Sequence, residues 1–409
     1  MMNRSGGAAR RPSILMLAPE PVLQPRGTPM SVYHRLRALS ALGYAVDLVT
    51  YPLGEAIDIP HVRVLRVWRP WGLRRIKIGP SAPKLLLDLF LAVVALGCVL
   101  RRRYDAIHSH EEAVFIAAAY AALFRLPHLY DMHSSLPQQL SNWRQWYATP
   151  ASRLAASMER WAIRRSDVLI TICPALTDCV RAIDPTKPQV TIENAATFDA
   201  DAGPDAATAL RARYGVGSAP LVVYTGNFEP YQGVELLLES FALAHARLPQ
   251  ATLMIVGGGA ADGEPVRRRV RQLGIESAVV LTGSVPPEAV PGFLAAADVL
   301  ASPRVSGTNT PLKLYAYLKA AKPVVATDLP THTQLLSQEN AILASPEPAA
   351  FAAGLVTALT DRARGAQAAR GAKALADARL TDAVYRERVA QAYRLLLPTH
   401  VSPCAASAA

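Results

Sequence analysis

Apolar and polar positions follow two periods along the chain, one typical of buried strands and one typical of helices. Short runs such as Ser13–Ala18 and Val168–Ile172 are apolar on both faces, which predicts parallel strands covered by helices on both sides. The amphipathic stretch Pro29–Leu42 is typical of a helix, and Gly43 stands where a C-cap glycine belongs. The other strands predicted in this half are Ala45–Thr50, Val62–Val67, Ala106–Ser109, His128–Asp131 and Gln189–Glu193.

The second half of the chain repeats this alternation. Its predicted strands are Leu221–Thr225, Ala251–Val256, Ala278–Leu281, Asp298–Ala301 and Pro323–Ala326. Its predicted helices are Val234–Arg247, Glu264–Leu273, Pro287–Ala296 and Leu312–Ala321. Two such arrays in series predict an α/β protein with two Rossmann-like, doubly wound parallel-sheet domains, at residues 1–195 and 196–380. The Ala-, Asp- and Gly-rich stretch Asn194–Pro204 is typical of a linker, and residues 381–409 are expected to form a helix and a disordered tail.

Composition supports large cores, because 51% of the 409 residues are hydrophobic and 18% are charged. Four cysteines without a CxxC pair (Cys98, Cys173, Cys179 and Cys404) favour buried thiols in a reducing compartment over a disulfide framework or a zinc site. The first dozen residues lack the apolar centre of a signal peptide. We therefore expect a cytoplasmic protein.

The net charge of +11 is concentrated in one segment. Arg66–Arg103 contains nine Lys or Arg and a single acid, together with Trp68 and Trp71. This composition favours an anionic membrane surface or a phosphorylated lipid acceptor, and a solvated basic face explains it equally well. No nucleic-acid-binding module accompanies the charge, so we expect no nucleic-acid partner. The apolar run Leu85–Leu100 has 16 residues and includes Asp88, which predicts a packed helix instead of a spanning one.

In open α/β sheets ligands bind at the carboxyl ends of the strands, so the loops after the strands are the places to search. After the first strand, Thr28 is a suitable N-cap and Pro29 a suitable first helical residue, while Gly27 lets the backbone approach a ligand.

The second domain repeats this pattern, with Thr310 as the expected N-cap, Pro311 as the first helical residue and Lys313 in the first turn. A lysine is unfavourable at that end of a helix, and a bound phosphate or diphosphate would explain it. Thr-Pro begins helices in many proteins without any ligand, but that explanation leaves Lys313 and Arg304 unaccounted for.

Histidines and acids gather at two strand ends of the first domain. His108, His110 and Glu111 end one strand, and Asp131 and His133 end the next. Two histidines at i and i+2 bind a metal only if they share a strand face, and no HExxH spacing supports such a site here. A histidine near an aspartate is better suited to orienting or deprotonating a hydroxyl, so His133 is the favoured residue. A purely structural role remains open for each of these residues.

With these motifs in this order, the chain resembles glycosyltransferase family 4. The resemblance covers nearly the whole length, and its most specific part is Pro311–Leu318 running into Ala321–Ala326, similar to the family's "PlKlyEYlAaGkPVva". Weaker elements are Gly27–Pro29, Leu42–Val46, Tyr104–His110, Asp131–His133, Glu193–Ala195, Tyr224–Phe228 with Gly233, and Leu253–Gly257.

The resemblance implies a GT-B fold, in which the two domains face each other across a cleft and the C-terminal helix returns to the first. It implies retaining, metal-independent transfer from a UDP- or GDP-sugar bound on the second domain to an acceptor on the first. Together with the basic segment Arg66–Arg103, we expect this acceptor to be a lipid-linked or cell-envelope glycan. The nucleotide-sugar is a substrate, so no cofactor is expected. The expected catalytic residues are His133 and Lys313. The expected donor or phosphate residues are Gly27, Thr28, Gly226, Asn227, Gln232, Arg304, Thr308, Asn309, Thr310, Pro311 and Leu312. The acceptor-side residues are His110, Glu111 and Asp131.

The chain departs from the family pattern at the donor site. Thr308 and Ala316 stand where the family usually has two glutamates, and Asn227 and Gln232 stand where it has an arginine and a lysine. Arg304 and Lys313 would restore the positive charge, as a hypothesis. An inactive GT-B protein that binds an active transferase is the alternative. A nicotinamide dehydrogenase is disfavoured, because neither first βα turn carries the glycine fingerprint.

Overall fold

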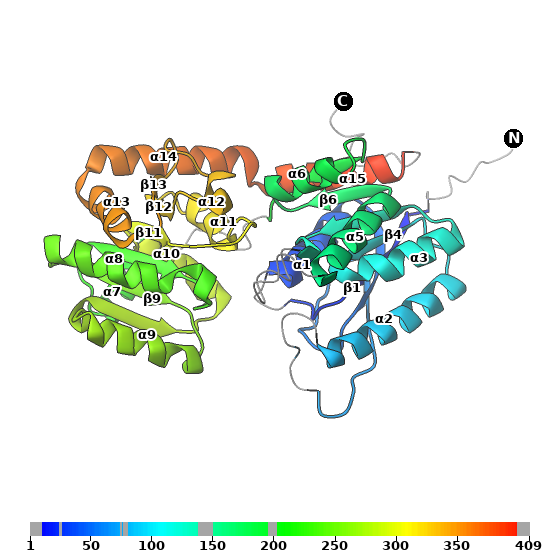
Figure 1. The fold of residues 1–409 in the computed structure, drawn as a ribbon, viewed down its shortest axis with the longest axis horizontal. Helices are drawn as coiled ribbons and strands as arrows, with labels where there is room; N and C mark the ends of the chain where they lie inside the picture. Colours follow the sequence, from blue (N-terminus) through cyan, green and yellow to red (C-terminus); the bar gives the residue numbers. More distant parts are fainter. Residues whose placement is uncertain are drawn as a thin grey trace, which may run out of the picture. The chain divides into compact units, whose positions relative to one another are not determined.

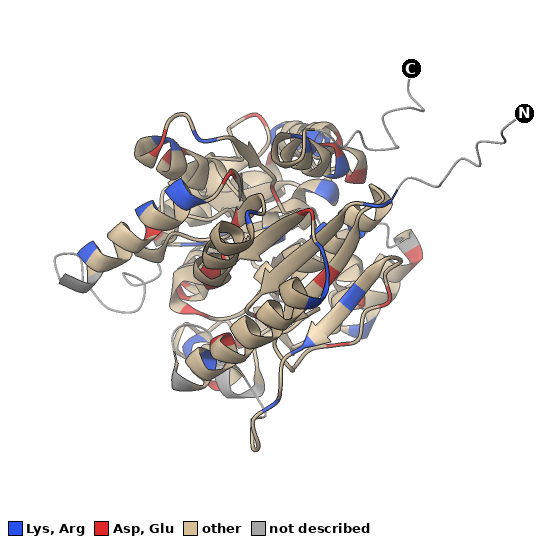
Figure 2. Cartoon of the chain, turned by 90° about the vertical axis from the view of Figure 1, so that its right-hand side faces the viewer, with Lys and Arg blue, Asp and Glu red and all other residues tan. Residues whose placement is uncertain are grey.

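The computed structural model describes residues 10–23, 27–73, 76, 81–137, 150–194 and 203–398. The chain divides into two compact units (Figure 1). Unit 1 comprises Met1–Glu193 and Asp382–Ala409, and unit 2 comprises Asn194–Thr381. Each unit contains one parallel sheet. In the view of Figure 2, both acidic and basic residues lie on the described helices and loops.

The sheet of unit 1 has seven strands in the order β3-β2-β1-β4-β5-β6-β7. Their bounds are β1 (Ser13–Ala18), β2 (Ala45–Thr50), β3 (Val62–Arg66), β4 (Ala106–His110), β5 (His128–Met132), β6 (Val168–Thr171) and β7 (Gln189–Thr191). The strand order reverses between β1 and β4. In doubly wound folds this switch point is where ligands bind, at the carboxyl ends of the strands.

The helices of unit 1 are α1 (Gly27–Ala41), α2 (Ala82–Arg101), α3 (Val114–Phe124), α5 (Pro150–Arg165), α6 (Pro174–Ile183) and α15 (Asp382–Leu396). One core lies where Leu87 and Leu91 of α2 meet Leu15 and Leu17 of β1. Although α15 is last in the sequence, it packs against α1, β6 and β7. The chain end therefore contributes side chains to the first sheet.

The sheet of unit 2 has six strands in the order β10-β9-β8-β11-β12-β13, with its switch point between β8 and β11. The strands are β8 (Leu221–Thr225), β9 (Thr252–Val256), β10 (Val279–Gly283), β11 (Val299–Ser302), β12 (Val324–Thr327) and β13 (Ile342–Ala344). Along β9, Leu253 and Ile255 enter one core while Met254 and Val256 enter the other. This alternation is how a parallel sheet covered on both faces must pack.

The helices of unit 2 cover both faces of this sheet. They are α7 (Pro204–Arg213), α8 (Val234–Arg247), α9 (Ala260–Gln272), α10 (Val290–Ala296), α11 (Leu312–Lys319), α12 (Pro330–Thr333), α13 (Pro348–Thr360) and α14 (Arg362–Arg379). The sequence did not predict β13, whose three residues are too few to show a period.

Both predicted threonine N-caps are wrong. Helix α1 already includes Gly27 and Thr28, so Thr28 lies in its first turn. Helix α11 begins at Leu312, after an extended Pro311 with φ −60° and ψ 129°, so Thr310 lies before the cap position. Lys313 is nevertheless in the first turn of α11, as predicted.

Candidate active site

A buried network of ionisable side chains lies at the carboxyl ends of β4 and β5 in unit 1. His108, His110 and Asp131 are fully buried, and His133 is nearly so. His108 and His110 are two positions apart on β4 and share one face, with ring centroids 4.6 Å apart. The parallel register places Asp131 beside His110. Unit 1 thus gathers three of its predicted residues, His110, Asp131 and His133, in one place.

Asp131 is paired with Arg35 of α1, a residue that the sequence analysis did not single out. Arg35 Nε donates to Asp131 Oδ2 at 2.9 Å, and a second guanidinium nitrogen lies 2.8 Å from the same oxygen. Burial by itself would raise the pKa of Asp131, but Arg35 and His133 outweigh burial and hold that pKa well below its usual range. The carboxylate is therefore an ionised, acceptor-only group inside the fold.

His133 faces this carboxylate through its Nε2 atom. That nitrogen lies 3.2 Å from Asp131 Oδ1 and 3.2 Å from His110 Nδ1. Because an ionised carboxylate only accepts, the contact favours the tautomer of His133 with its proton on Nε2. Burial, and next the neighbouring His108, lower the pKa of His110 well below its usual value, so His110 is neutral. Asp131 thus fixes the orientation of the His133 ring.

The network extends to α15 through a tyrosine. The hydroxyl of Tyr393 lies 2.8 Å from His108 Nδ1. Burial, followed by Tyr44, raises the pKa of Tyr393 well above its usual value, so the hydroxyl keeps its proton. His108 Nε2 lies 3.5 Å from Asp131 Oδ2, and because an ionised carboxylate only accepts, this contact favours the tautomer of His108 with its proton on Nε2. Nδ1 of His108 then accepts a hydrogen bond from the Tyr393 hydroxyl. Arg35 and His108 therefore both present N–H groups to the Asp131 carboxylate.

Carboxyl groups lie beside this network at the switch point of unit 1. Glu111, with φ +46°, follows β4 directly, and its Oε2 accepts a hydrogen bond from Ser134 Oγ at 2.8 Å. Burial raises the pKa of Glu111 to about 7, against the opposing effect of His133. Burial, and next Glu111, also raise the pKa of Glu20 well above its usual value. Glu111 can therefore gain or lose a proton near neutral pH.

The histidines also meet the geometric condition for a metal site. Ligand atoms of His108, His110 and Asp131 lie within 4.8 Å of one another, all buried. The guanidinium of Arg35, however, already occupies Asp131 Oδ2 and would repel a cation there. The arrangement therefore suits a hydrogen-bonded network better than a metal centre.

A second group of predicted residues meets in unit 2, beside the first turn of α11. Lys313 Nζ lies 3.8 Å from the centroid of the Tyr224 ring. A Cβ added to Gly226, where φ is +147°, would lie 3.0 Å from Lys313 Nζ and 3.0 Å from the Tyr224 hydroxyl. Glycine thus leaves room for the ammonium group at the end of β8. Burial, and next Arg304, lower the pKa of Lys313 well below its usual value.

Arg304 lies in the loop between β11 and α11. Its guanidinium donates to the carbonyls of Ser306 at 2.9 Å and Asn309 at 3.0 Å, and lies 5.0 Å from the centroid of the Tyr231 ring. Among the described residues, no carboxylate forms an ion pair with Arg304 or Lys313. Two partly buried basic side chains without a counter-ion form a site with affinity for an anion, which would in turn favour the charged form of Lys313.

Side chains of β12, of α12 and of the residue after α12 hydrogen-bond to the backbone of the loop that carries Arg304. Three side chains donate to three of its carbonyls: Thr327 Oγ1 to Arg304 O at 2.5 Å, Thr331 Oγ1 to Asn309 O at 2.7 Å, and Gln334 Nε2 to Thr308 O at 2.8 Å. Bonds from several sides fix the course of the loop and hence the place of the guanidinium.

Thr310 completes this group. It is 6% exposed, and in the described part of the chain its Oγ1 has no hydrogen-bond partner. An unmatched buried hydroxyl is costly, so such a group points to a ligand that would satisfy it. Pro311 is buried and Leu312 is exposed. Two cations, a hydroxyl and a helix N-terminus together suit a diphosphate.

Of the other predicted donor residues, Asn227 lies beside Lys313 in unit 2, whereas Gly27 and Thr28 lie in unit 1. The carbonyl of Asn227 accepts a hydrogen bond from Tyr224 at 2.7 Å, which ties it to the wall around Lys313. Gln232 ends a short 3-10 turn, and its buried Oε1 lacks a partner within the described ranges. Gly27 and Thr28 lie in unit 1, at the start of α1, the helix that carries Arg35 into the histidine network.

Arg35 and Tyr393 are the functional residues that the sequence analysis missed. Arg35 falls on the apolar stripe of α1, among Val32, Leu36 and Leu39, and a charge on a buried stripe is a usable signal. Tyr393 gave no such signal, because an aromatic residue on an amphipathic helix is ordinarily part of the core.

Two family models match the chain. The model described as "Glycosyl transferase 4-like domain" matches residues 26–195, and the one described as "Glycosyl transferases group 1" matches residues 219–361. Together they cover more than half of the chain. The first match lies almost entirely in unit 1, and the second lies in unit 2.

Solved structures show the same architecture. HepE from Anabaena, in complex with UDP, superposes with a TM-score of 0.72 over 93% of this chain and 98% of its own, at 20% identity. Sucrose-phosphate synthase from Thermosynechococcus elongatus gives 0.76 over 95% of this chain and 100% of its own, also at 20% identity. The protein is therefore a GT-B protein with two Rossmann-like domains. With the two family models, this places it among the glycosyltransferases of the family 4 type.

Curated relatives are matched over part of their length. A GDP-mannose-dependent alpha-(1-6)-phosphatidylinositol monomannoside mannosyltransferase of Mycolicibacterium smegmatis is 36% identical over 129 residues, which is 30% of this chain and 34% of that protein. A D-inositol 3-phosphate glycosyltransferase of Corynebacterium efficiens is 26% identical over 289 residues, which is 65% of this chain and 66% of that protein. The chain thus spans between one third and two thirds of these relatives.

Proposed function

We propose that this protein transfers a sugar from a UDP- or GDP-sugar to an acceptor hydroxyl, with retention at the anomeric carbon and without a metal ion. The observation that carries the proposal is the pair of cations Lys313 and Arg304, which have no carboxylate partner in the described structure, beside the first turn of α11. The names of the relatives support a nucleotide-sugar donor, since one depends on GDP-mannose and a structural neighbour was solved with UDP.

The donor diphosphate would bind to the group in unit 2. Lys313 and Arg304 would meet the phosphate charges, and Thr310 Oγ1 and the first amides of α11 would donate hydrogen bonds. During transfer the bond from the anomeric carbon to the diphosphate oxygen breaks, the acceptor hydroxyl oxygen bonds to the same face of the sugar, and the proton of that hydroxyl passes to the departing diphosphate. Negative charge then grows on the diphosphate, and preorganised cations stabilise it without a metal.

The acceptor would bind at the histidine network of unit 1. Asp131 contacts His133, and the carboxyl group of Glu111, whose pKa is about 7, lies beside them. Such a site can hold and orient a hydroxyl group. We propose a lipid-linked or cell-envelope glycan as the acceptor, met at the cytoplasmic face of the membrane. The basic segment Arg66–Arg103 and the lipid acceptor in the name of the mycobacterial relative support this choice.

A panel of UDP-, GDP- and ADP-sugars tests the donor half of the proposal. Thermal unfolding is measured with each sugar nucleotide, and release of the nucleoside diphosphate is then followed. One nucleotide is expected to raise the unfolding temperature and to be hydrolysed slowly without acceptor. If no nucleotide stabilises the protein, the transferase proposal fails and the binding-partner alternative replaces it.

A further inference from the structure

Helix α2 is apolar both on the side that packs against the sheet and on the side that faces away from it. Leu87, Leu91 and Ala95 recur every four residues and pack against the sheet. The opposite side also carries apolar side chains, and these are exposed: Leu85, Leu86, Leu89, Val93 and Leu100. A helix of a water-soluble domain normally turns charges outward. This outer face is therefore built for a non-aqueous neighbour.

The two ionisable residues near the start of α2, Lys84 and Asp88, interact with side chains of unit 1 and not with solvent alone. Lys84 forms an ion pair with Glu112, and Asp88 accepts a hydrogen bond from the buried Tyr51 hydroxyl at 2.5 Å. They therefore do not interrupt the exposed apolar stripe. Pro83–Arg101 is long and apolar enough to cross a membrane by length and composition, and 17% of its most apolar stretch is buried. The predicted packed helix is thus only half right, because one side packs and the other does not.

Aromatic and basic residues frame this apolar stripe. Trp68 lies with its ring 5.6 Å from that of Phe90 on α2, and Trp71 in the same loop is fully exposed. Arg69 beside them and the three arginines at positions 101–103 are all exposed. Tryptophan and arginine beside an apolar stripe are typical of residues at the level of lipid headgroups.

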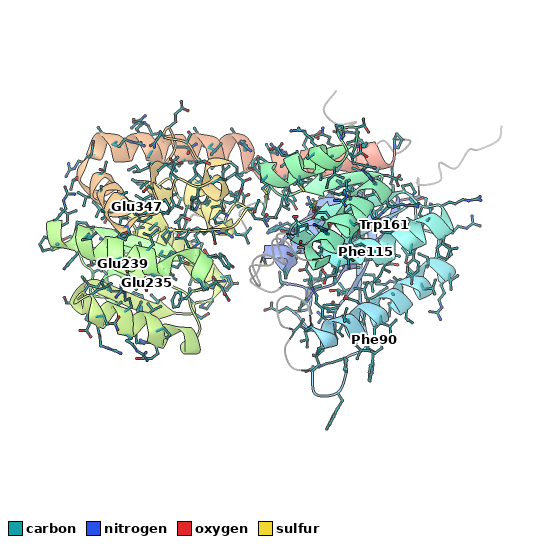
Figure 3. The ribbon with its side chains drawn as sticks, in the orientation of Figure 1. Phe90, Phe115, Trp161, Glu235, Glu239 and Glu347 are labelled. Atoms are coloured by element: carbon teal, nitrogen blue, oxygen red, sulfur yellow. The ribbon has the colours of Figure 1, made fainter. Side chains whose placement is uncertain are left out.

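The apolar face continues onto the neighbouring helices. Tyr120 of α3 donates to the carbonyl of Ala92 on α2 at 2.9 Å, which joins the two helices. Phe115 of α3 stacks on Trp161 of α5 with centroids 5.9 Å apart, and Figure 3 shows these two rings and Phe90 on their three helices. Further exposed apolar side chains on α3 and α5 are Leu123, Leu154 and Met158.

From this arrangement we propose that the outer face of α2, framed by Trp68, Trp71 and the arginines 101–103, inserts into the interface of an anionic lipid leaflet. The helix lies in the plane of the membrane, because Leu87, Leu91 and the inward ion pair of Lys84 keep it on its sheet. The positive charge of this segment favours an anionic leaflet over a neutral one. Residues 66–103 include nine basic residues and one acid, which suits anionic headgroups. The inference rests on the proposed function only for the lipid nature of the acceptor.

Co-sedimentation with vesicles tests this docking without any sugar nucleotide. The full chain is mixed with vesicles of phosphatidylcholine and phosphatidylglycerol, and separately with pure phosphatidylcholine vesicles. Binding to the anionic vesicles is expected, together with weaker binding in high salt. The double variant Leu89→Glu/Val93→Glu should lose about tenfold in affinity or more, since it places two charges in the apolar layer.

The matched control is Leu243→Glu, which charges an exposed leucine on α8 in unit 2 and should bind like the wild type. Vesicle binding that is absent, or equal in both variants, overturns the proposal. Self-association in sedimentation velocity that Leu89→Glu/Val93→Glu abolishes, without vesicle binding, overturns it in favour of a second copy of the chain. Sugar-nucleotide stabilisation does not enter this readout, so failure here leaves the donor proposal standing.

Discussion

The hydroxyl of Tyr393 lies 2.8 Å from Nδ1 of His108, although 285 positions separate the two residues. Through this contact the last helix of the chain reaches the network in which Asp131 holds His133. The C-terminal helix α15 therefore does more than cover the sheet, because it supplies the hydroxyl that bonds Nδ1 of His108 in the network of the proposed acceptor site.

Tyr393→Phe removes this contact and little else. We expect a loss of about 1 kcal/mol in the free energy of unfolding, because one buried hydrogen bond disappears. Turnover should also fall, since Nδ1 of His108 no longer accepts a hydrogen bond from Tyr393. Nitrogen chemical shifts of the His108 ring report the tautomer directly. Tyr44→Phe is the control, because Tyr44 packs 4.9 Å from the Tyr393 ring without contacting His108. Unchanged His108 shifts in Tyr393→Phe would contradict this role.

Arg35→Met is expected to destabilise the protein by about 3–5 kcal/mol, because it leaves the buried Asp131 carboxylate without its cation. Urea unfolding of the purified variant measures the loss. Arg37→Met, on the exposed side of the same helix, should change stability by no more than about 0.5 kcal/mol. If the two variants are equally stable, Asp131 does not depend on Arg35.

Glu111 gives a pH dependence with a defined sign. Its pKa is raised to about 7 in the folded protein, from an ordinary value of 4.5. The folded state therefore binds more protons between these values, so its contribution to stability is full below pH 4.5 and is lost as pH rises through 7. Glu111→Gln should thus gain stability relative to the wild type at pH 8, by up to about 3 kcal/mol, and little at pH 5. Urea unfolding at both pH values checks this, and an equal difference at both would contradict it.

Lys313→Met should separate stability from ligand binding. Burial lowers the pKa of Lys313, and in the described residues no carboxylate pairs with it, so its charge is unfavourable in the free protein. The variant should therefore unfold about 2 °C higher than the wild type without ligand, or more. It should also lose the further stabilisation that the sugar nucleotide gives the wild type. An unfolding temperature that still rises with nucleotide would exclude Lys313 from the phosphate site.

Much of the fold could be predicted from the sequence, because runs such as Leu221–Thr225 and Thr252–Val256 are apolar on both faces and bounded by turn residues. Helix α2 shows what the apolar pattern of a sequence cannot predict, namely whether protein or another phase covers an apolar face. A helix that is apolar all round gives the same sequence signal whether a protein or a lipid covers it, so Leu85–Leu100 was predicted as packed although its outer face is exposed.

The site was predictable where its residues come just after strands, because topology brings strand ends together. His133 is the first residue after β5 and Arg304 is the second after β11. The pairing of Arg35 with Asp131 crosses 96 positions and that of Tyr393 with His108 crosses more, and spacing carries no information at such separations. The N-cap at Thr310 failed for a local reason, since the backbone at Pro311 is extended and α11 begins only at Leu312. The N-cap at Thr28 failed because α1 already includes Gly27.

The central claim is that Lys313 and Arg304 hold the diphosphate of a sugar donor. The most direct measurement is isothermal titration calorimetry of UDP and GDP into the wild type, Lys313→Met, Arg304→Gln and the control Lys319→Met, which changes the last turn of the same helix. One nucleotide should bind the wild type and the control alike, and about tenfold or more weaker to each of the other two variants. Equal affinity for all four proteins would contradict the claim.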